Sequence, residues 1–323
     1  MQYVGLHAQQ ARNNFRSVLL LFLFPCLVIL LTFMFSALLA LFTADYDTDN
    51  MNVWDQSLEI TGSLAPYILI GVAVWFVIAY FANTAMIRSA TGARPLERKE
   101  NKRVYNLVEN MCMTKGMTMP KVNIIEDDSL NAFASGINNK TYTVSLSRGI
   151  INKLDDDELE GVIAHELSHI RNRDVRLLIV SIVFVGIFAM LTNIAFRTLL
   201  YAPRRSRSSN GKNQGGIIVV ILIALVVAVV GYFFSSMMRF AISRNREYMA
   251  DAAAAEMTRQ PLALANALRK ISRDPDIEAV TRDDVAQLFI EHPRKKEKLF
   301  SGISGLFATH PPIEKRIAIL EQF

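Results

Sequence analysis

The sequence has 323 residues, of which 51% are hydrophobic, enough for one sizeable domain or two small ones. Its formal net charge is +5, but no DNA- or RNA-binding motif accompanies it, so the basic residues indicate flanks facing anionic lipid and no nucleic-acid partner. The two cysteines, Cys26 and Cys112, are far apart, which excludes a disulfide framework or a cysteine metal pair and indicates a reducing compartment.

The hydrophobic residues gather in four runs without charged side chains, at residues 17–44, 60–87, 177–196 and 213–238. A helix needs about 20 apolar residues to cross a bilayer core, so each run is long enough. A single run is compatible with a buried core helix, but four together predict an integral membrane protein. The first run exceeds the about 7–15 apolar residues of a signal peptide and is predicted to be an uncleaved signal anchor.

Charged residues around the first two runs predict their orientation. Arg12 and Arg16 precede the first run without any acid, and the loop after it is acidic without any base. Basic residues cluster again from Arg88 to Arg103, after the second run. The positive-inside rule therefore predicts a cytoplasmic N-terminus, an external first loop and a cytoplasmic segment from Arg88 onwards.

The third and fourth runs are harder to orient, because the loop between them and both of their outer flanks are basic. They either cross the bilayer or form a hairpin that enters without crossing, and in both cases the chain returns to the side it left. The predicted organisation is a cytoplasmic segment (1–17), a transmembrane helix (18–43), an acidic external loop (44–63), a second transmembrane helix (64–87), the first part of a cytoplasmic domain (88–174), a hydrophobic helix (175–196), a basic flexible loop (197–215), another hydrophobic helix (216–238) and the second part of the cytoplasmic domain (239–323).

The cytoplasmic domain is predicted to contain a small β-sheet. Residues Arg98 to Cys112 have the apolar spacing of a helix, and three short β-type runs follow at Lys121–Glu126, Leu130–Ser135 and Thr141–Ser147. Asn138 and the asparagine after it suit a turn between the last two strands.

Helices are predicted for most of the remaining domain. Four consecutive acids, from Asp155 to Glu158, favour a helix N-terminus. Later helices are expected up to Thr258, from Pro261 to about Arg273, and after Pro311. The fold class is therefore a mainly α integral membrane protein with four hydrophobic helices and an α+β domain.

The helix after Asp155 contains the sequence His165-Glu166-Leu167-Ser168-His169. Histidines four residues apart share one face of a helix, so His165 and His169 can bind one metal ion. Glu166 lies beside the first ligand, where it can act as a base on water. This pattern is typical of zincin-type zinc proteases; the alternative is an amphipathic helix whose histidines are incidental.

Catalytic zinc usually has three protein ligands. The other histidines are His7, His292 and His310, and glutamate is also a good third ligand. The best candidate is Glu247, because uninterrupted helices would hold it and His169 at equal heights, about 12 Å from the ends of the hydrophobic runs. Asp251 lies one turn further on and can accept a hydrogen bond from a ligating histidine.

These residues resemble the HtpX-type heat-shock proteases of bacteria and, more distantly, the CAAX prenyl proteases of the same peptidase family. Two further stretches match: Asn131-Ala132-Phe133-Ala134 is similar to the substrate-binding edge strand of the family, and His310-Pro311-Pro312, followed by Arg316, is similar to its C-terminal motif. The resemblance implies that residues 131–134 and Arg316 contact substrate and that His310 is a catalytic residue that helps to bind the oxyanion.

The resemblance also implies a zinc metalloendopeptidase with one zinc ion per chain, multi-pass in the bacterial inner membrane, with its protease domain facing the cytoplasm. Its substrates would be misfolded or unfolded membrane proteins, and other membrane quality-control proteases are possible partners in a stress response. Alternatives remain open: a prenyl-protein protease, a non-catalytic chaperone-like protein, or another divalent metal. Asn131 could simply cap a turn, and His310 could simply start a helix.

Overall fold

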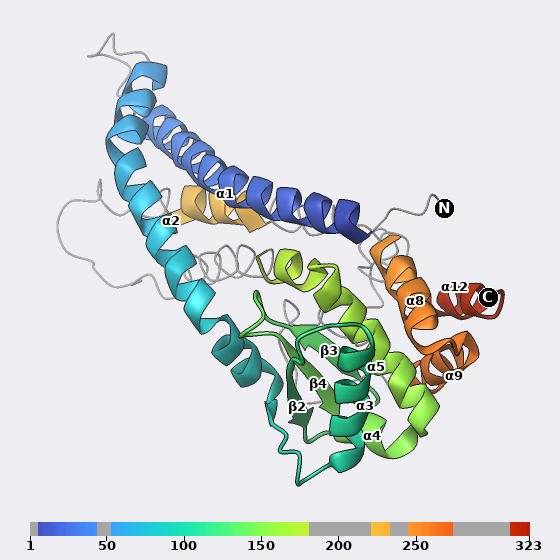
Figure 1. Cartoon of the computed structure of the whole chain (residues 1–323). Coiled ribbons are helices and arrows are strands. Elements are labelled where there is room, and N and C mark those ends of the chain that lie inside the picture. Colours follow the sequence, from blue (N-terminus) through green and yellow to red (C-terminus); the bar gives the residue numbers. More distant parts are fainter. Residues whose placement is uncertain (1–5, 44–52, 181–220, 233–244, 274–310) are drawn as a thin grey trace, which may run out of the picture. The chain divides into compact units, whose positions relative to one another are not determined.

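The computed structural model describes residues 6–43, 53–180, 221–232, 245–273 and 311–323 (Figure 1). The chain divides into two compact units. The first comprises Met1–Ser17, Tyr80–Val180 and Arg239–Phe323, and the second comprises Val18–Ala79 and Ser181–Met238.

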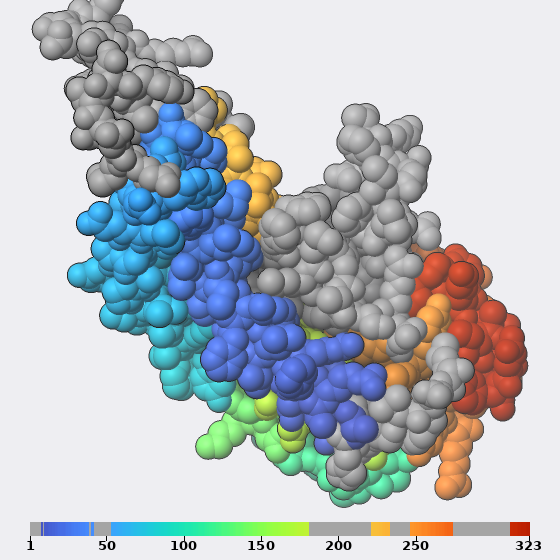
Figure 2. All heavy atoms as spheres, turned by 90° about the horizontal axis from the view of Figure 1, so that it is seen from above, coloured from blue at the N-terminus to red at the C-terminus, as the bar shows by residue number. Residues whose placement is uncertain are grey.

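The second unit contains most of two long helices, α1 (Leu6–Thr43) and α2 (Val53–Thr91). They lie side by side, as the adjacent dark and light blue spheres in Figure 2 show. Aromatic rings join them: the centroids of Phe24 and Phe76 are 5.8 Å apart, and those of Phe33 and Trp54 are 6.0 Å apart.

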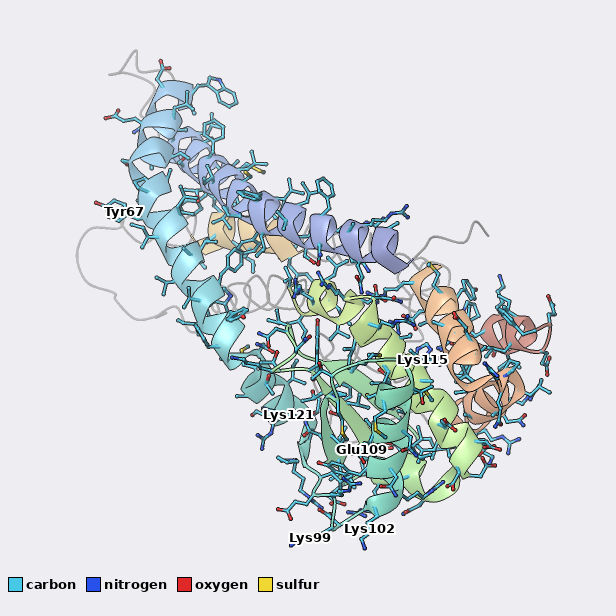
Figure 3. The ribbon with its side chains drawn as sticks, viewed as in Figure 1. Tyr67, Lys99, Lys102, Glu109, Lys115 and Lys121 are labelled. Carbon is cyan, nitrogen blue, oxygen red and sulfur yellow. The ribbon has the colours of Figure 1, made fainter. Side chains whose placement is uncertain are left out.

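Both helices are long and apolar enough to span a membrane. The candidate spans are Gln10–Leu38, with mean hydropathy 2.9, and Val53–Thr91, with mean hydropathy 2.2. Large apolar side chains on them face outward: Phe22 is 72% exposed, and Tyr67 on α2, 73% exposed, points away from the helix (Figure 3). The core helix of a soluble protein would bury such side chains, whereas a lipid-facing helix exposes them.

Helix α2 begins at Val53, so residues 53–63 of the expected loop 44–63 are helical. Asp55 lies in the first turn of α2, where a negative charge is favourable at a helix N-terminus. Acidic residues in this segment are therefore compatible with the first turn of a helix as well as with a loop.

The prediction of four hydrophobic helices is confirmed for two. Of the third and fourth runs, the structure describes only residues 177–180 and the apolar helix Ile221–Tyr232. The basic loop 197–215 lies outside the described residues. Whether these runs cross the bilayer therefore stays a prediction.

The first unit contains a four-stranded sheet of β1 (Arg94–Pro95), β2 (Lys121–Ile125), β3 (Ala132–Ser135) and β4 (Thr143–Ser147). The strand order is β1-β2-β4-β3, in which β2 and β4 are parallel and β3 is antiparallel to β4. The three longer strands lie where the sequence predicts them, while the two-residue β1 is too short to give a sequence pattern. Among the described strands, β3 lies at one edge of the sheet.

Helix α3 (Lys102–Thr114) begins four positions after the predicted Arg98. Asn101 caps it, because its side chain accepts a hydrogen bond from the Val104 N–H at 3.0 Å. Exposed lysines, including Lys99 and Lys102, lie at this end of the helix (Figure 3).

The remaining helices are α4 (Arg148–Lys153), α5 (Asp156–Arg171), α8 (Asn245–Thr258), α9 (Pro261–Ile271) and α12 (Ile313–Leu320). Helix α5 contacts strands β3 and β4 as well as helices α3, α8 and α9, and α12 packs on α8 and α9 (Figure 1). The core of the first unit therefore surrounds α5, the helix that contains the histidine motif.

Candidate metal centre

Helix α5 holds its side chains in place through a strong N-terminal cap and nearly complete burial. Asp155 and Glu158 form a reciprocal capping box, in which each side chain accepts a hydrogen bond from the backbone of the other. Two turns later His165 and Glu166 are 1% and 2% exposed. The rings of His165 and His169 lie edge to face, with centroids 4.7 Å apart. The four-residue spacing therefore brings both imidazoles to one point.

Helix α8 brings an acidic pair to the same point. Glu247 lies in its first turn, and Asp251 follows one turn later. Their exposed fractions are 2% and 1%, so both carboxylates are buried against α5.

Three groups, His165, His169 and Glu247, present ligand atoms that all lie within 4.8 Å of one another. The two Nε2 atoms are 3.2 Å apart, and the Glu247 carboxylate oxygens lie 3.6 Å from His165 Nε2 and 3.7 Å from His169 Nε2. Tetrahedral zinc with bonds of about 2.0–2.1 Å needs ligand atoms about 3.4 Å apart. The donor set and its spacing therefore fit a tetrahedral metal ion.

The second nitrogen of His165 is held by a buried ion pair. Asp251 Oδ1 lies 2.9 Å from His165 Nδ1, and Arg316 binds Asp251 through two hydrogen bonds, of 2.8 Å from Nε and 2.7 Å from Nη2. Arg316 is only 1% exposed. Because Nδ1 donates to the carboxylate, the lone pair of Nε2 faces the metal position.

The second nitrogen of His169 is held by Asp174, a residue that the sequence analysis missed. Asp174 Oδ2 lies 3.1 Å from His169 Nδ1, and Asp174 is 1% exposed. Its signal in the sequence is weak, because one acid five residues after a histidine does not share its helical face.

The chain reaches Asp174 through a break that the sequence analysis did not expect. The prediction of Glu247 as third ligand assumes an uninterrupted helix from His169 to Leu177, but α5 ends at Arg171, and helical structure resumes at Asp174. Arg173 adopts a positive φ of 61°, which turns the chain between the two helices. The assumption of one straight helix is therefore wrong, although the expected meeting of His169 with Glu247 is observed.

Glu166 faces strand β3. Its carboxylate accepts a hydrogen bond from the Ala134 backbone, and burial raises its pKa above the usual range. At the start of β3, the Asn131 side chain accepts from the Ala132 N–H at 2.9 Å, and the Asn131 N–H donates to Ser147 Oγ at 3.1 Å. The predicted stretch 131–134 thus lies beside the candidate base, and it is buried.

The charges of the centre favour a bound cation. Burial would lower the pKa of His169, but Glu247 and Asp174 raise it to about 10. Burial would also lower the pKa of His165, but Asp251 and Glu247 raise it above its usual value. Burial opposes ionisation of Asp251, but Arg316 lowers its pKa to about 2. Without a metal His169 therefore holds a proton at neutral pH, and a metal ion would displace it.

Six predicted site residues meet at this centre: His165, Glu166, His169, Glu247, Asp251 and Arg316. The predicted catalytic residue His310 lies outside the described residues. Two further residues of the centre are not predicted by the sequence: Asp174, and Asn13, which donates to Asp174 at 2.5 Å. Asn13 gave no usable signal, because asparagines near a membrane run are common.

Comparison with known proteins gives one family. The family model described as "Peptidase family M48" matches residues 98–323 of this chain. A Protease HtpX homolog of Bacteroides fragilis is 67% identical over 324 residues, covering 100% of both chains. Another, from Listeria innocua, is 40% identical over 255 residues, covering 77% of this chain and 83% of the relative.

A solved structure is also similar, that of S. mikatae Ste24p. The TM-score is 0.48 at 18% sequence identity, and the match covers 82% of this chain and 61% of that one.

Proposed function

Because this chain belongs to peptidase family M48 and is a membrane-bound metalloprotease, we propose that its metal is zinc and that its substrates are misfolded or unfolded membrane proteins. The observation that supports this most is the convergence of His165, His169 and Glu247, whose ligand atoms lie within 4.8 Å of one another. Two imidazoles and one carboxylate are a common ligand set of catalytic zinc in proteases.

In this proposal His165, His169 and Glu247 would hold one zinc ion per chain. When bound, zinc supplies a Lewis acid that lowers the pKa of water and polarises the scissile carbonyl. Asp251 and Asp174 each accept a hydrogen bond from one histidine and so fix its ring orientation.

Glu166 is the proposed general base. Its pKa is raised by burial, which brings a carboxyl group closer to the neutral range in which it can both accept and release a proton. Glu166 takes a proton from the attacking water and delivers it to the leaving amine. His310 stays a proposed donor to the developing oxyanion.

Strand β3, with residues 131–134, is the proposed substrate-binding strand. An extended peptide can pair with a strand edge through main-chain hydrogen bonds, which tolerate many sequences and suit unfolded substrates. The Ala134 backbone contacts Glu166, so a peptide beside β3 would lie close to the base. Arg316 remains a proposed substrate contact, and its two bonds to Asp251 support a second role in orienting His165.

The proposal is tested by metal removal. We expect the purified full-length protein in detergent to contain one zinc ion per chain and to cleave an unfolded model substrate. A chelator should abolish cleavage, and stoichiometric zinc should restore it. Cleavage that persists without metal would contradict the proposal.

The same assay separates the alternatives. Cleavage restricted to a prenylated C-terminal peptide would favour a CAAX-type protease. Suppression of substrate aggregation without cleavage would favour a chaperone-like protein.

We further propose that the chain is a multi-pass protein of the bacterial inner membrane with its protease unit in the cytoplasm. The acidic segment after the first run and the basic residues from Arg88 support this orientation. A periplasmic phosphatase reporter should be active when fused at Asp49 and inactive when fused after Phe323. The reverse pattern would exclude the proposed orientation, and a fusion at Gly211 decides whether the third and fourth runs cross.

A further inference from the structure

We propose that Asn13, in the helix that leads into the first membrane run, is a positioning residue of the metal centre that acts on His169 through Asp174. This inference rests on the proposed zinc site. It assigns residues 6–17, which the sequence presents only as a flank of a membrane anchor, to the protease unit.

The contact is direct and buried. Asn13 Nδ2 donates to Asp174 Oδ1 at 2.5 Å and to the Asn172 carbonyl at 3.0 Å. The other oxygen of Asp174, Oδ2, lies 3.1 Å from His169 Nδ1. Asn13 is 6% exposed, and Asp174 is 1% exposed. One amide therefore connects the N-terminal helix to a candidate zinc ligand through a single carboxylate.

The amide also fixes Asp174 relative to α5. The last carbonyls of a helix have no partner within that helix. Asn13 binds the carbonyl of Asn172, and Gln10 Nε2 donates to the carbonyl of Arg171 at 2.7 Å. The N-terminal helix thus docks on the end of α5 that holds His169, just where the chain turns towards Asp174.

The two candidate histidine ligands are supported differently. The carboxylate behind His165 is paired with the guanidinium of Arg316, whereas the carboxylate behind His169 receives a neutral amide from Asn13. A buried carboxylate needs donors for its oxygens, since an unsatisfied buried charge is costly. The amide satisfies Asp174 without neutralising it, so its negative charge remains available to His169.

The test compares two matched changes of amide to carboxylate in the same helix, Asn13→Asp and Gln10→Glu. Zinc affinity of the full-length protein in detergent is measured by competition with a chromogenic chelator. Asn13→Asp should weaken zinc binding about tenfold, because the new carboxylate cannot donate and repels Asp174. Gln10→Glu also loses a bond to the end of α5, but zinc affinity should stay within about twofold, because Gln10 contacts the Arg171 carbonyl and not Asp174.

A third variant separates hydrogen bonding from packing. Aspartate nearly matches asparagine in shape, so a packing role predicts that Asn13→Ala is worse than Asn13→Asp, and the proposed role predicts the opposite order. The absorption spectrum of the cobalt-substituted protein should change in Asn13→Asp and not in Gln10→Glu. If Asn13→Asp fails to fold, Asn13→Ala alone must still weaken zinc binding measurably, with a metal-free melting temperature close to that of wild type.

Failure of this inference is distinguishable from failure of the zinc site. If wild type and His169→Ala bind zinc equally, the proposed function is wrong. If wild type binds zinc through His169 while Asn13→Asp binds it as tightly as wild type, only the role of Asn13 is wrong.

Discussion

Replacing Glu166 with glutamine is expected to lower kcat about 1000-fold or more while the protein keeps its zinc. Glutamine has nearly the same shape as glutamate, so the buried position beside β3 should accept it. It cannot take a proton from water, and general acid–base catalysis contributes about 10²–10⁴-fold to the rate. Glu166 is not among the three converging ligand groups, so zinc binding should persist.

The measurement is cleavage of an unfolded substrate together with the zinc content of the same sample. Glu160→Gln is a matched control, because Glu160 lies on the same helix and outside the metal centre. It should retain the activity of wild type. If Glu166→Gln retains more than about a tenth of that activity, Glu166 is not the base.

Replacing Glu247 with alanine is expected to remove both zinc and activity. Loss of a group that only orients a ligand typically weakens metal binding about 10–100-fold, and loss of a ligand itself should exceed that range. His165 and His169 would remain, but two ligands do not make a catalytic zinc site. The zinc content therefore separates this variant from Glu166→Gln, since both are inactive and only one is metal-free.

The matched control for this variant is Glu256→Ala, an exposed glutamate on the same helix α8. It should leave zinc content and cleavage unchanged. Full zinc occupancy in Glu247→Ala would show that the third ligand is another residue, and His310 would then be the first candidate to test.

The spacing of residues within one helix or one strand predicts much of the local structure. His165 and His169 meet because helical spacing brings positions four apart to one face, whatever the rest of the fold does. The two candidate membrane helices follow from long uncharged runs, and the three longer strands follow from short β-type runs. Helix α3 begins four positions later than predicted, because the cap at Asn101 sets its start through a single hydrogen bond.

Glu247 lies between local patterns and long-range contacts in how far the sequence predicts its place. The sequence favours Glu247 only if straight helices stand above the hydrophobic runs. The structure brings Glu247 to both histidines although α5 breaks after Arg171. The break matters for the site, because the turn at Arg173 brings Asp174 back to His169.

Residues that are close in the sequence predict the candidate centre: a helix with two imidazoles and a proposed base, an acid able to complete the ligand set, and apolar runs of membrane length. The groups that hold those candidate ligands in place become visible only in the folded chain. Asn13 and Asp174 are 161 positions apart, and Arg316 and Asp251 are 65 apart. Periodicity describes neighbours along one helix or strand, whereas such distant contacts exist only once the elements have packed against one another.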